Sequence, residues 1–170
     1  PTPREIADVF VSARLSARAT PDFPGPIPQA LDVSYAIQDE AIALYPDRIA
    51  GWKVGGVPPA QQPKLGIHRV AGAIFSRNVW TSEADGTTAL PAIDGGFAAV
   101  ESEFVARIGV DADAAKTDWT VEEAADIVDA IFIGVELAGS SLSSINDLGS
   151  TVVASDFGNN GGLIVGPEVS

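Results

Sequence analysis

The spacing of apolar residues predicts two helices near the N-terminus. In residues 3–18 the apolar positions fall on one helical face, at Ile6, Val9, Phe10 and Ala13. A proline-rich stretch at 21–28 cannot continue this helix and predicts an extended connection. We expect the second helix to start at an N-cap, Asp32, and to end near Tyr45. Its predicted buried stripe is Val33, Ala36, Ile37, Ala41 and Leu44.

Beyond residue 48 the pattern changes to short apolar runs, which are typical of strands. Strands are predicted at 49–57, 70–75, 97–108, 132–138 and 161–165. The polar, glycine- and proline-bearing stretches 58–68 and 81–96 predict loops. Thr120 and Glu123 form a capping box, which predicts a third helix whose apolar stripe runs from Val121 to Ile131. Helices kept apart from a mixed or antiparallel sheet indicate the α+β class.

Composition describes a globular protein. With 170 residues, 46% of them hydrophobic and 19% charged, the chain can bury a real core. No apolar run reaches the roughly 18–20 residues needed to cross a bilayer, and no signal-peptide pattern opens the chain. We therefore expect a cytoplasmic protein that does not bind membranes.

Charge and cysteine content exclude some kinds of site. The net charge is −13 and the ten basic residues are scattered, which argues against nucleic acid as a partner. Cysteine is absent, so disulfides and thiolate metal sites are excluded. Methionine is absent too, even at position 1, either by chance or because the chain is a fragment.

The strand predicted at 97–108 carries the most informative pattern. One face would hold Val100, Ser102, Phe104, Ala106 and Ile108, which we expect to be the core face. The other face holds Glu101, Glu103, Val105 and Arg107, with the two glutamate backbones about 7 Å apart. Carboxylates this close repel unless a cation separates them or one is protonated, and oxygen ligands suit Mg²⁺ or Mn²⁺. The alternative is a solvated face on which Arg107 serves as counter-charge.

Two other residues could carry chemistry. Lys53 lies in an apolar, glycine-flanked strand, where desolvation could bring its amine into an acid–base role; a surface lysine at a strand end is the alternative. His68 is the only histidine, which excludes a histidine-rich metal site. It is either a loop residue or a residue that lines the site.

Four motifs in the right order resemble the 2-keto-4-pentenoate hydratases, in the hydratase/decarboxylase branch of the fumarylacetoacetate hydrolase superfamily. The segment 51–55, GWKVG, resembles their G-[YW]-K-[VI]-G element, and 101–104, ESEF, resembles their E-x-E-[FA] metal motif. Residues 66–75 resemble the segment between the two, and 156–166 resemble an aspartate- and asparagine-rich turn that leads to a glycine-ended strand. The resemblance runs from about residue 31 to the end.

The resemblance implies a mixed β-roll core, a divalent cation, Mg²⁺ or Mn²⁺, and a 2-oxo acid chelated through its carboxylate and keto oxygen. The metal would stabilise an enolate. The resemblance implies Glu101 and Glu103 as metal ligands and Lys53 as a catalytic residue. We add Glu136 as a candidate third metal ligand, His68 as a candidate catalytic residue, and Trp52 and Asp156 as candidate substrate contacts. We expect residues 1–30 to form an N-terminal helix and connection, and residues 31–170 a catalytic β-rich domain that is incomplete at its C-terminus.

The chain departs from the family pattern after Glu136. Many relatives read E-[IL]-x-D-S-R where this chain has Gly139 and Ser141 in place of the aspartate and arginine. Either Glu136 or Asp156 would complete the metal site, or metal binding would be weakened.

Three functions follow from the resemblance. The first is a lyase, a hydratase that adds water to a 2-oxo-4-alkenoic acid of the 2-hydroxypenta-2,4-dienoate type in aromatic catabolism. The second is a 2-oxo acid decarboxylase or an acylpyruvate-type C–C hydrolase on the same scaffold, with His68 as the base for hydrolysis. The third is a non-catalytic relative that binds a small acid or supports a partner subunit. By analogy with the family we expect a homo-oligomer.

Overall fold

Two helices precede the strands in the computed structural model, which describes residues 1–82 and 87–169. The helices are α1 (Pro3–Leu15), α2 (Leu31–Leu44), α3 (Gln62–Leu65), α4 (Val121–Asp126) and α5 (Ser150–Ser155), with 3-10 turns η1 (Ser76–Asn78) and η2 (Phe157–Asn159). The strands are β1 (Ile49–Gly56), β2 (Arg69–Phe75), β3 (Val79–Thr81), β4 (Phe97–Ile108), β5 (Val128–Ser140) and β6 (Asn160–Glu168). Within the described ranges, no helix has the length and hydropathy of a membrane span.

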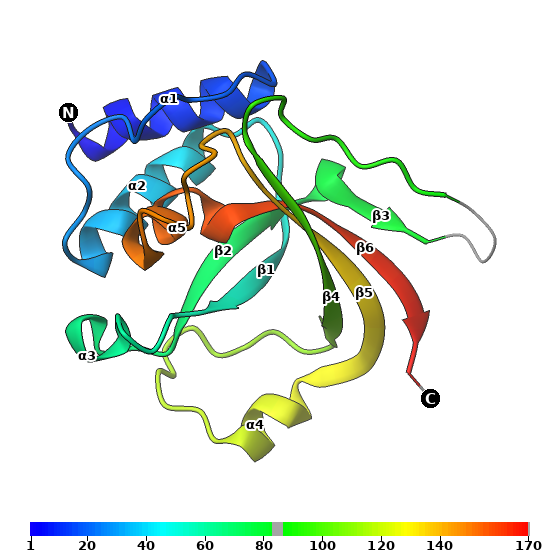
Figure 1. The fold of residues 1–170 in the computed structure, drawn as a ribbon. Helices are drawn as coiled ribbons and strands as arrows, with labels where there is room; N and C mark the ends of the chain where they lie inside the picture. The colour runs from blue at the N-terminus through cyan, green and yellow to red at the C-terminus, as the bar shows by residue number, and fades with distance from the viewer. Residues whose placement is uncertain (83–86, 170) are drawn as a thin grey trace.

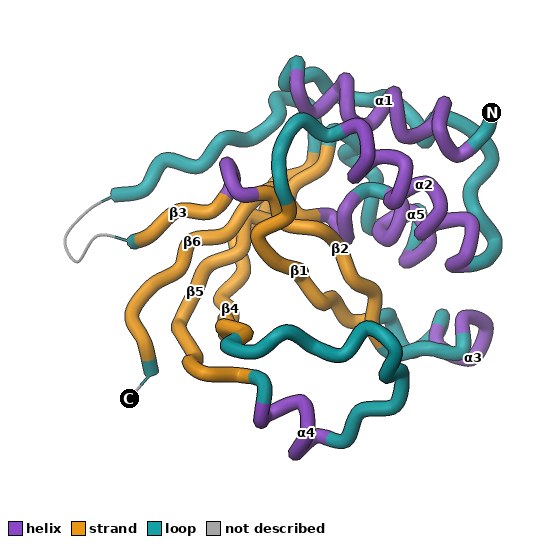
Figure 2. Tube along the Cα trace, turned by 180° about the vertical axis from the view of Figure 1, so that it is seen from behind, coloured by secondary structure: helices purple, strands orange, loops and turns teal. Residues whose placement is uncertain are grey.

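The strands form two sheets. β1 and β2 pair antiparallel as a two-stranded sheet, and the second sheet has the order β3-β6-β5-β4. β3 runs parallel to β6, whereas the β6–β5 and β5–β4 pairs are antiparallel. Helices α1, α2 and α5 gather at one end of the molecule, and the four-stranded sheet extends away from them (Figures 1 and 2). This is the predicted α+β architecture with a mixed sheet.

The main core lies where α1, α2, α5 and β2 meet. Phe10, Ile37 and Val152 come from the three helices and are completely buried. Phe157 in η2 packs edge-on against Phe75 of β2, with ring centroids 5.1 Å apart. Burying an aromatic or aliphatic side chain of this size contributes about 1.5–3 kcal/mol to the stability of the fold. This cluster therefore holds the helices against β2.

Local signals explain where the helices begin. In α1, Thr2 is the N-cap and forms a reciprocal capping box with Glu5. In α4, Thr120 and Glu123 form the predicted capping box. The predicted N-cap Asp32 is wrong, because α2 already begins at Leu31 and Ala30 is its N-cap. Asp32 instead lies in the first turn, where a negative charge favours the helix dipole.

Several element boundaries differ from the prediction because tertiary pairing outweighs local pattern. Helix α4 ends at Asp126, and the apolar residues Val128 and Ile131 belong to β5, where they pair with β4. The short elements α3, β3 and α5 were not predicted. Of the loop predicted at 81–96, residues 87–96 contain no helix or strand, and residues 83–86 lie outside the described residues.

The predicted core face of β4 is wrong. Val100, Phe104 and Ile108 are 71%, 76% and 54% exposed. Alternation along a strand shows that its two faces differ, but the packing of other elements decides which face is covered. Here the glutamate-bearing face is the one turned toward the β1 side of the molecule, as the contact between Lys53 and Glu136 shows.

Candidate metal and substrate site

Pairing between β4 and β5 brings three carboxylates together. Glu101 lies directly opposite Glu136 in the antiparallel ladder, and Glu103 lies opposite Gly134. Side chains at paired positions project from the same face of a sheet, so all three glutamates share one face. One carboxylate oxygen from each lies within 4.8 Å of the others. Their exposure falls stepwise, from exposed Glu101 through half-buried Glu103 to buried Glu136.

Glu136 has the most constrained environment of the three. One of its oxygens, Oε2, is 3.2 Å from Lys53 Nζ, and the other, Oε1, accepts a hydrogen bond of 2.9 Å from Asn160 Nδ2. Burial raises the pKa of the Glu136 carboxyl, while the Lys53 charge and the Asn160 hydrogen bond lower it and the Glu101 charge raises it further. Burial dominates, because removing a carboxylate from water disfavours its charged form.

Lys53 reaches the carboxylates from the other sheet. It lies in β1 opposite Gly72, and its side chain is only 12% exposed. A Cβ atom at Gly158 would lie 2.8 Å from Lys53 Cδ, and Gly158 has a left-handed φ of 65°. Glycine at this position therefore satisfies the turn and leaves room for the lysine stem.

A cavity of about 760 Å³ opens beside these groups, between β1 and the four-stranded sheet. Lys53, Glu103, Glu136 and Arg107 form its polar part. Trp52 also lines it and is 53% exposed. The rest of the wall is mostly apolar and comes from all six strands, β1 to β6. A concave apolar site with a few convergent polar groups is the usual form of a small-molecule site.

The charges and donor atoms fit a divalent cation. With all groups ionised, three carboxylates and one ammonium carry a net charge of −2, which one divalent cation balances. Carboxylate oxygens are the ligands that Mg²⁺, Mn²⁺ and Ca²⁺ prefer. Buried Glu136 would be the anchoring ligand, and half-buried Glu103 and exposed Glu101 would leave one side open for water or a chelating acid.

Strand register explains why Gly139 does not remove a carboxylate from this site. Gly139 pairs with Ala98, whereas Glu136 pairs with Glu101. Positions 136 and 139 therefore project from opposite faces of β5, and a side chain at 139 would point toward the Gly161 backbone. The third carboxylate of the cluster is Glu136.

Two predicted site residues lie elsewhere. His68 is exposed just before β2, where its Nδ1 is 2.7 Å from Gln62 Oε1, and it does not line the cavity. Asp156 is completely buried; its Oδ1 accepts a 2.7 Å hydrogen bond from Arg14 Nε, and its Oδ2 accepts one of 2.6 Å from Ser140. The structure thus places His68 in the exposed segment just before β2 and gives Asp156 structural partners.

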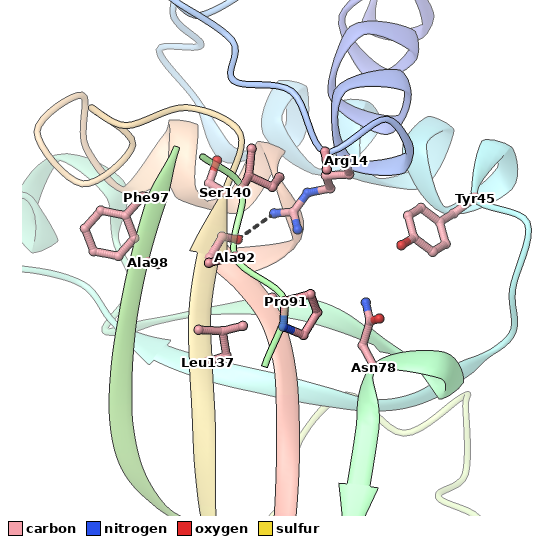
Figure 3. A pocket seen from close by; sticks show the side chains of 13 residues that line it. Arg14, Tyr45, Asn78, Pro91, Ala92, Phe97, Ala98, Leu137 and Ser140 are labelled. Atoms are coloured by element: carbon pink, nitrogen blue, oxygen red, sulfur yellow. Dashed lines mark hydrogen bonds between the residues drawn. The ribbon is translucent and has the colours of Figure 1, made fainter. Parts of the chain in front are cut away.

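Arg14 explains the environment of Asp156. Besides the carboxylate, its guanidinium donates to the carbonyl oxygens of Asn160 and Gly139, which joins α1 to β5 and β6. A smaller cavity of about 120 Å³ lies beside Arg14 and is separate from the carboxylate site (Figure 3). Tyr45, Asn78 and Ser140 also line it.

Sequence reasoning missed Asn160 and Arg14. Asn160 belongs to the asparagine-rich turn quoted above, but only the β5–β6 pairing shows that its side chain reaches Glu136. Arg14 lies in an amphipathic helix 142 residues from its partner, and no local pattern marks it as buried.

Comparison with known proteins supports the fold. No family model matches the chain, and no curated protein matches it. Among solved structures, 4-oxalocrotonate decarboxylase from Pseudomonas putida G7 matches 96% of this chain in two forms. The complex with calcium and acetate has a TM-score of 0.70 at 14% identity, and the complex with magnesium and adipate has 0.67 at 15%. The chain spans 61% and 62% of the length of those two chains. The predicted α+β fold with a mixed sheet is thereby confirmed, and it is shared with this decarboxylase.

Proposed function

We propose that this chain carries the metal site of a divalent-metal-dependent lyase that acts on a small 2-oxo acid. One observation carries the proposal: Glu101, Glu103 and Glu136 converge on one face, with Lys53 beside Glu136, at the edge of a cavity. The likeness to a decarboxylase solved with calcium or magnesium and with carboxylic acids supports it. Mg²⁺ or Mn²⁺ would be held by the three glutamates.

A bound divalent cation would supply Lewis-acid stabilisation of negative charge on the keto oxygen of the substrate. The residues of the chain would do the rest. Asn160 holds one oxygen of Glu136, which keeps the carboxylate oriented. Lys53 Nζ, 3.2 Å from the other oxygen, would hold the substrate carboxylate or deliver a proton to the substrate carbon chain. The apolar wall of the cavity would exclude water from the tail of the substrate.

Hydration of a 2-oxo-4-alkenoic acid is the first candidate reaction, and decarboxylation is the second. Decarboxylation is supported by the fact that both similar structures are of a decarboxylase. Both reactions need negative charge to be stabilised at the keto oxygen, so both are compatible with the same site. Hydrolytic C–C cleavage has less support, because the only histidine, His68, does not line the cavity.

Two assays separate the candidates. With 2-hydroxypenta-2,4-dienoate, hydratase activity would remove the absorbance of the conjugated diene. With 4-oxalocrotonate, decarboxylase activity would release carbon dioxide in stoichiometric amount. Either activity should require Mg²⁺ or Mn²⁺ and disappear with EDTA.

A non-catalytic, acid-binding role is tested by calorimetry. If the Mg²⁺-loaded chain binds a 2-oxo acid and both assays remain negative, the acid-binding role is favoured. If neither Mg²⁺ nor Mn²⁺ binds, or if metal binding is unchanged in Glu101→Ala and Glu103→Ala, the metal site is wrong.

A further inference from the structure

The walls of the cavity change from polar to apolar with distance from the carboxylates. Side chains at alternate positions share a face, so Val105 lies on the face of Glu103, about 7 Å further along β4. Phe132 is the cross-strand partner of Val105. Leu163 and Val165 of β6 pair with Glu136 and Gly134, which extends the same face across a third strand. All four apolar side chains line the cavity.

Gly134 leaves room for the apolar side chains around it because it has no side chain of its own. It lies opposite Glu103 and between Glu136 and Phe132 along β5. A Cβ atom here would lie 2.5 Å from Val105 Cγ2 and 2.9 Å from the Ile164 carbonyl oxygen. Glycine at this position therefore lets Val105 pack closely against β5 next to the acidic cluster.

No free positive charge faces this apolar part of the wall among the residues that the structure describes. The lining cations are Lys53, which is paired with Glu136, and Arg107, whose guanidinium lies 5.5 Å from the centre of the Phe132 ring and is paired with Asp129. Arg107 Nε is 2.7 Å from Asp129 Oδ1, and Glu168 adds a second negative charge nearby. A second carboxylate on the substrate would have to compete with Asp129 for Arg107. It would also be repelled by Asp129 and Glu168.

We infer that the substrate is a 2-oxo monocarboxylic acid with an extended apolar tail, which lies on Val105, Phe132, Leu163 and Val165. The cavity of about 760 Å³ is within the range of sites for drug-sized ligands and has room for more than a five-carbon acid. This inference rests on the proposed function, because the metal-bound end of the acid sets where its tail begins.

Binding of a series of acids to the Mg²⁺-saturated protein tests the inference by calorimetry. The series is oxalate, which chelates but has no tail, then 2-oxopentanoate, 2-oxooctanoate and the eight-carbon 2-oxo diacid. A fully buried methylene raises affinity about fourfold, so three could give up to about a sixtyfold gain from the five- to the eight-carbon acid. We expect a gain of at least about tenfold, since burial of the tail need not be complete. The diacid should bind more weakly than 2-oxooctanoate.

Matched variants assign the effect to the wall. Val105→Thr keeps the shape of the side chain and adds a hydroxyl, so it should weaken 2-oxooctanoate about threefold or more and leave oxalate unchanged. Val100→Thr, on the opposite face of the same strand and 71% exposed, should change neither. Circular dichroism would show that both variants fold.

The outcomes separate the inference from the function on which it rests. If oxalate shows no Mg²⁺-dependent binding, the proposed function fails and the inference fails with it. If oxalate binds but affinity does not rise with tail length, or the diacid binds more tightly than the monoacid, only the inference is overturned. An unchanged affinity of Val105→Thr for 2-oxooctanoate also overturns it.

Discussion

Lys53 and Glu136 form an ion pair between two separate sheets, with Nζ 3.2 Å from Oε2 and both side chains largely withdrawn from solvent. The pair joins the lysine of the two-stranded sheet to the carboxylate cluster of the four-stranded sheet. Because Glu136 has one oxygen on Lys53 and the other on Asn160, its position does not depend on a bound cation. The site is thus organised before a ligand arrives, which lowers the cost of binding.

Glu103→Gln should weaken Mg²⁺ and Mn²⁺ binding by about tenfold or more without unfolding the protein. The substitution keeps the shape but removes one of the charges that balance the cation, and Glu103 is only half-buried. Calorimetric titration measures the loss. Glu122→Gln, exposed on α4, is the control and should bind as the unchanged protein does. Equal affinities in the two variants would remove Glu103 from the metal site.

Lys53→Met should destabilise the metal-free protein by about 3 kcal/mol, because it leaves Glu136 buried without its cationic partner. Denaturant unfolding measures the loss. Adding Mg²⁺ should recover part of it, since the ion replaces the missing charge. Catalytic turnover should be lost even at saturating metal. A variant with normal turnover would make the role of Lys53 purely structural.

Metal affinity should fall as the pH is lowered from neutral into the acid range. Burial raises the pKa of Glu136, so protons compete with the cation for this carboxylate at a higher pH than for an exposed glutamate. In the metal-free protein, the proton on Glu136 stabilises the folded state at low pH. That contribution is lost as the pH rises through the raised pKa. Titrations at a series of pH values test this, and a flat profile would contradict it.

Asp156→Asn should lower stability by about 3 kcal/mol and leave metal affinity almost unchanged. The substitution removes the charge that faces Arg14, whose side chain is only 9% exposed, and Asp156 does not line the carboxylate cavity. Thermal unfolding and calorimetry measure the two effects. Asp129→Asn, which breaks the exposed pair with Arg107, is the control and should change stability little. If Asp156→Asn instead lost acid binding at normal stability, Asp156 would be a substrate residue.

Gly158→Ala should impair turnover, whereas Gly66→Ala should not. Both glycines have left-handed backbones, with φ of 65° and 69°, so each alanine costs about 1–2 kcal/mol of stability. Only at Gly158 would the added methyl press on the Lys53 stem; at Gly66 no atom lies within 4 Å. Turnover measured at equal folded fraction separates the two effects. Equal activities would show that Lys53 tolerates the displacement.

Sequence alone was enough for the elements with strong local signals. The capping box at Thr120, the strand from Phe97 to Ile108 and the lysine-bearing strand at 49–56 follow from hydrogen-bonding rules and side-chain alternation that act within a few residues. The same alternation placed Glu101 and Glu103 on one face, because successive side chains of a strand point to opposite sides.

Tertiary structure decided which face of β4 is covered and which distant residues complete the site. Val100 and Phe104 are apolar yet exposed, because nothing in the described chain packs on their face. Glu136 lies in the cluster because its strand register places it opposite Glu101. Asp156 instead pairs with Arg14, which lies near the other end of the chain. Local pattern fixes backbone conformation over a few residues, whereas these contacts depend on how whole sheets and helices pack, which their own short segments do not encode.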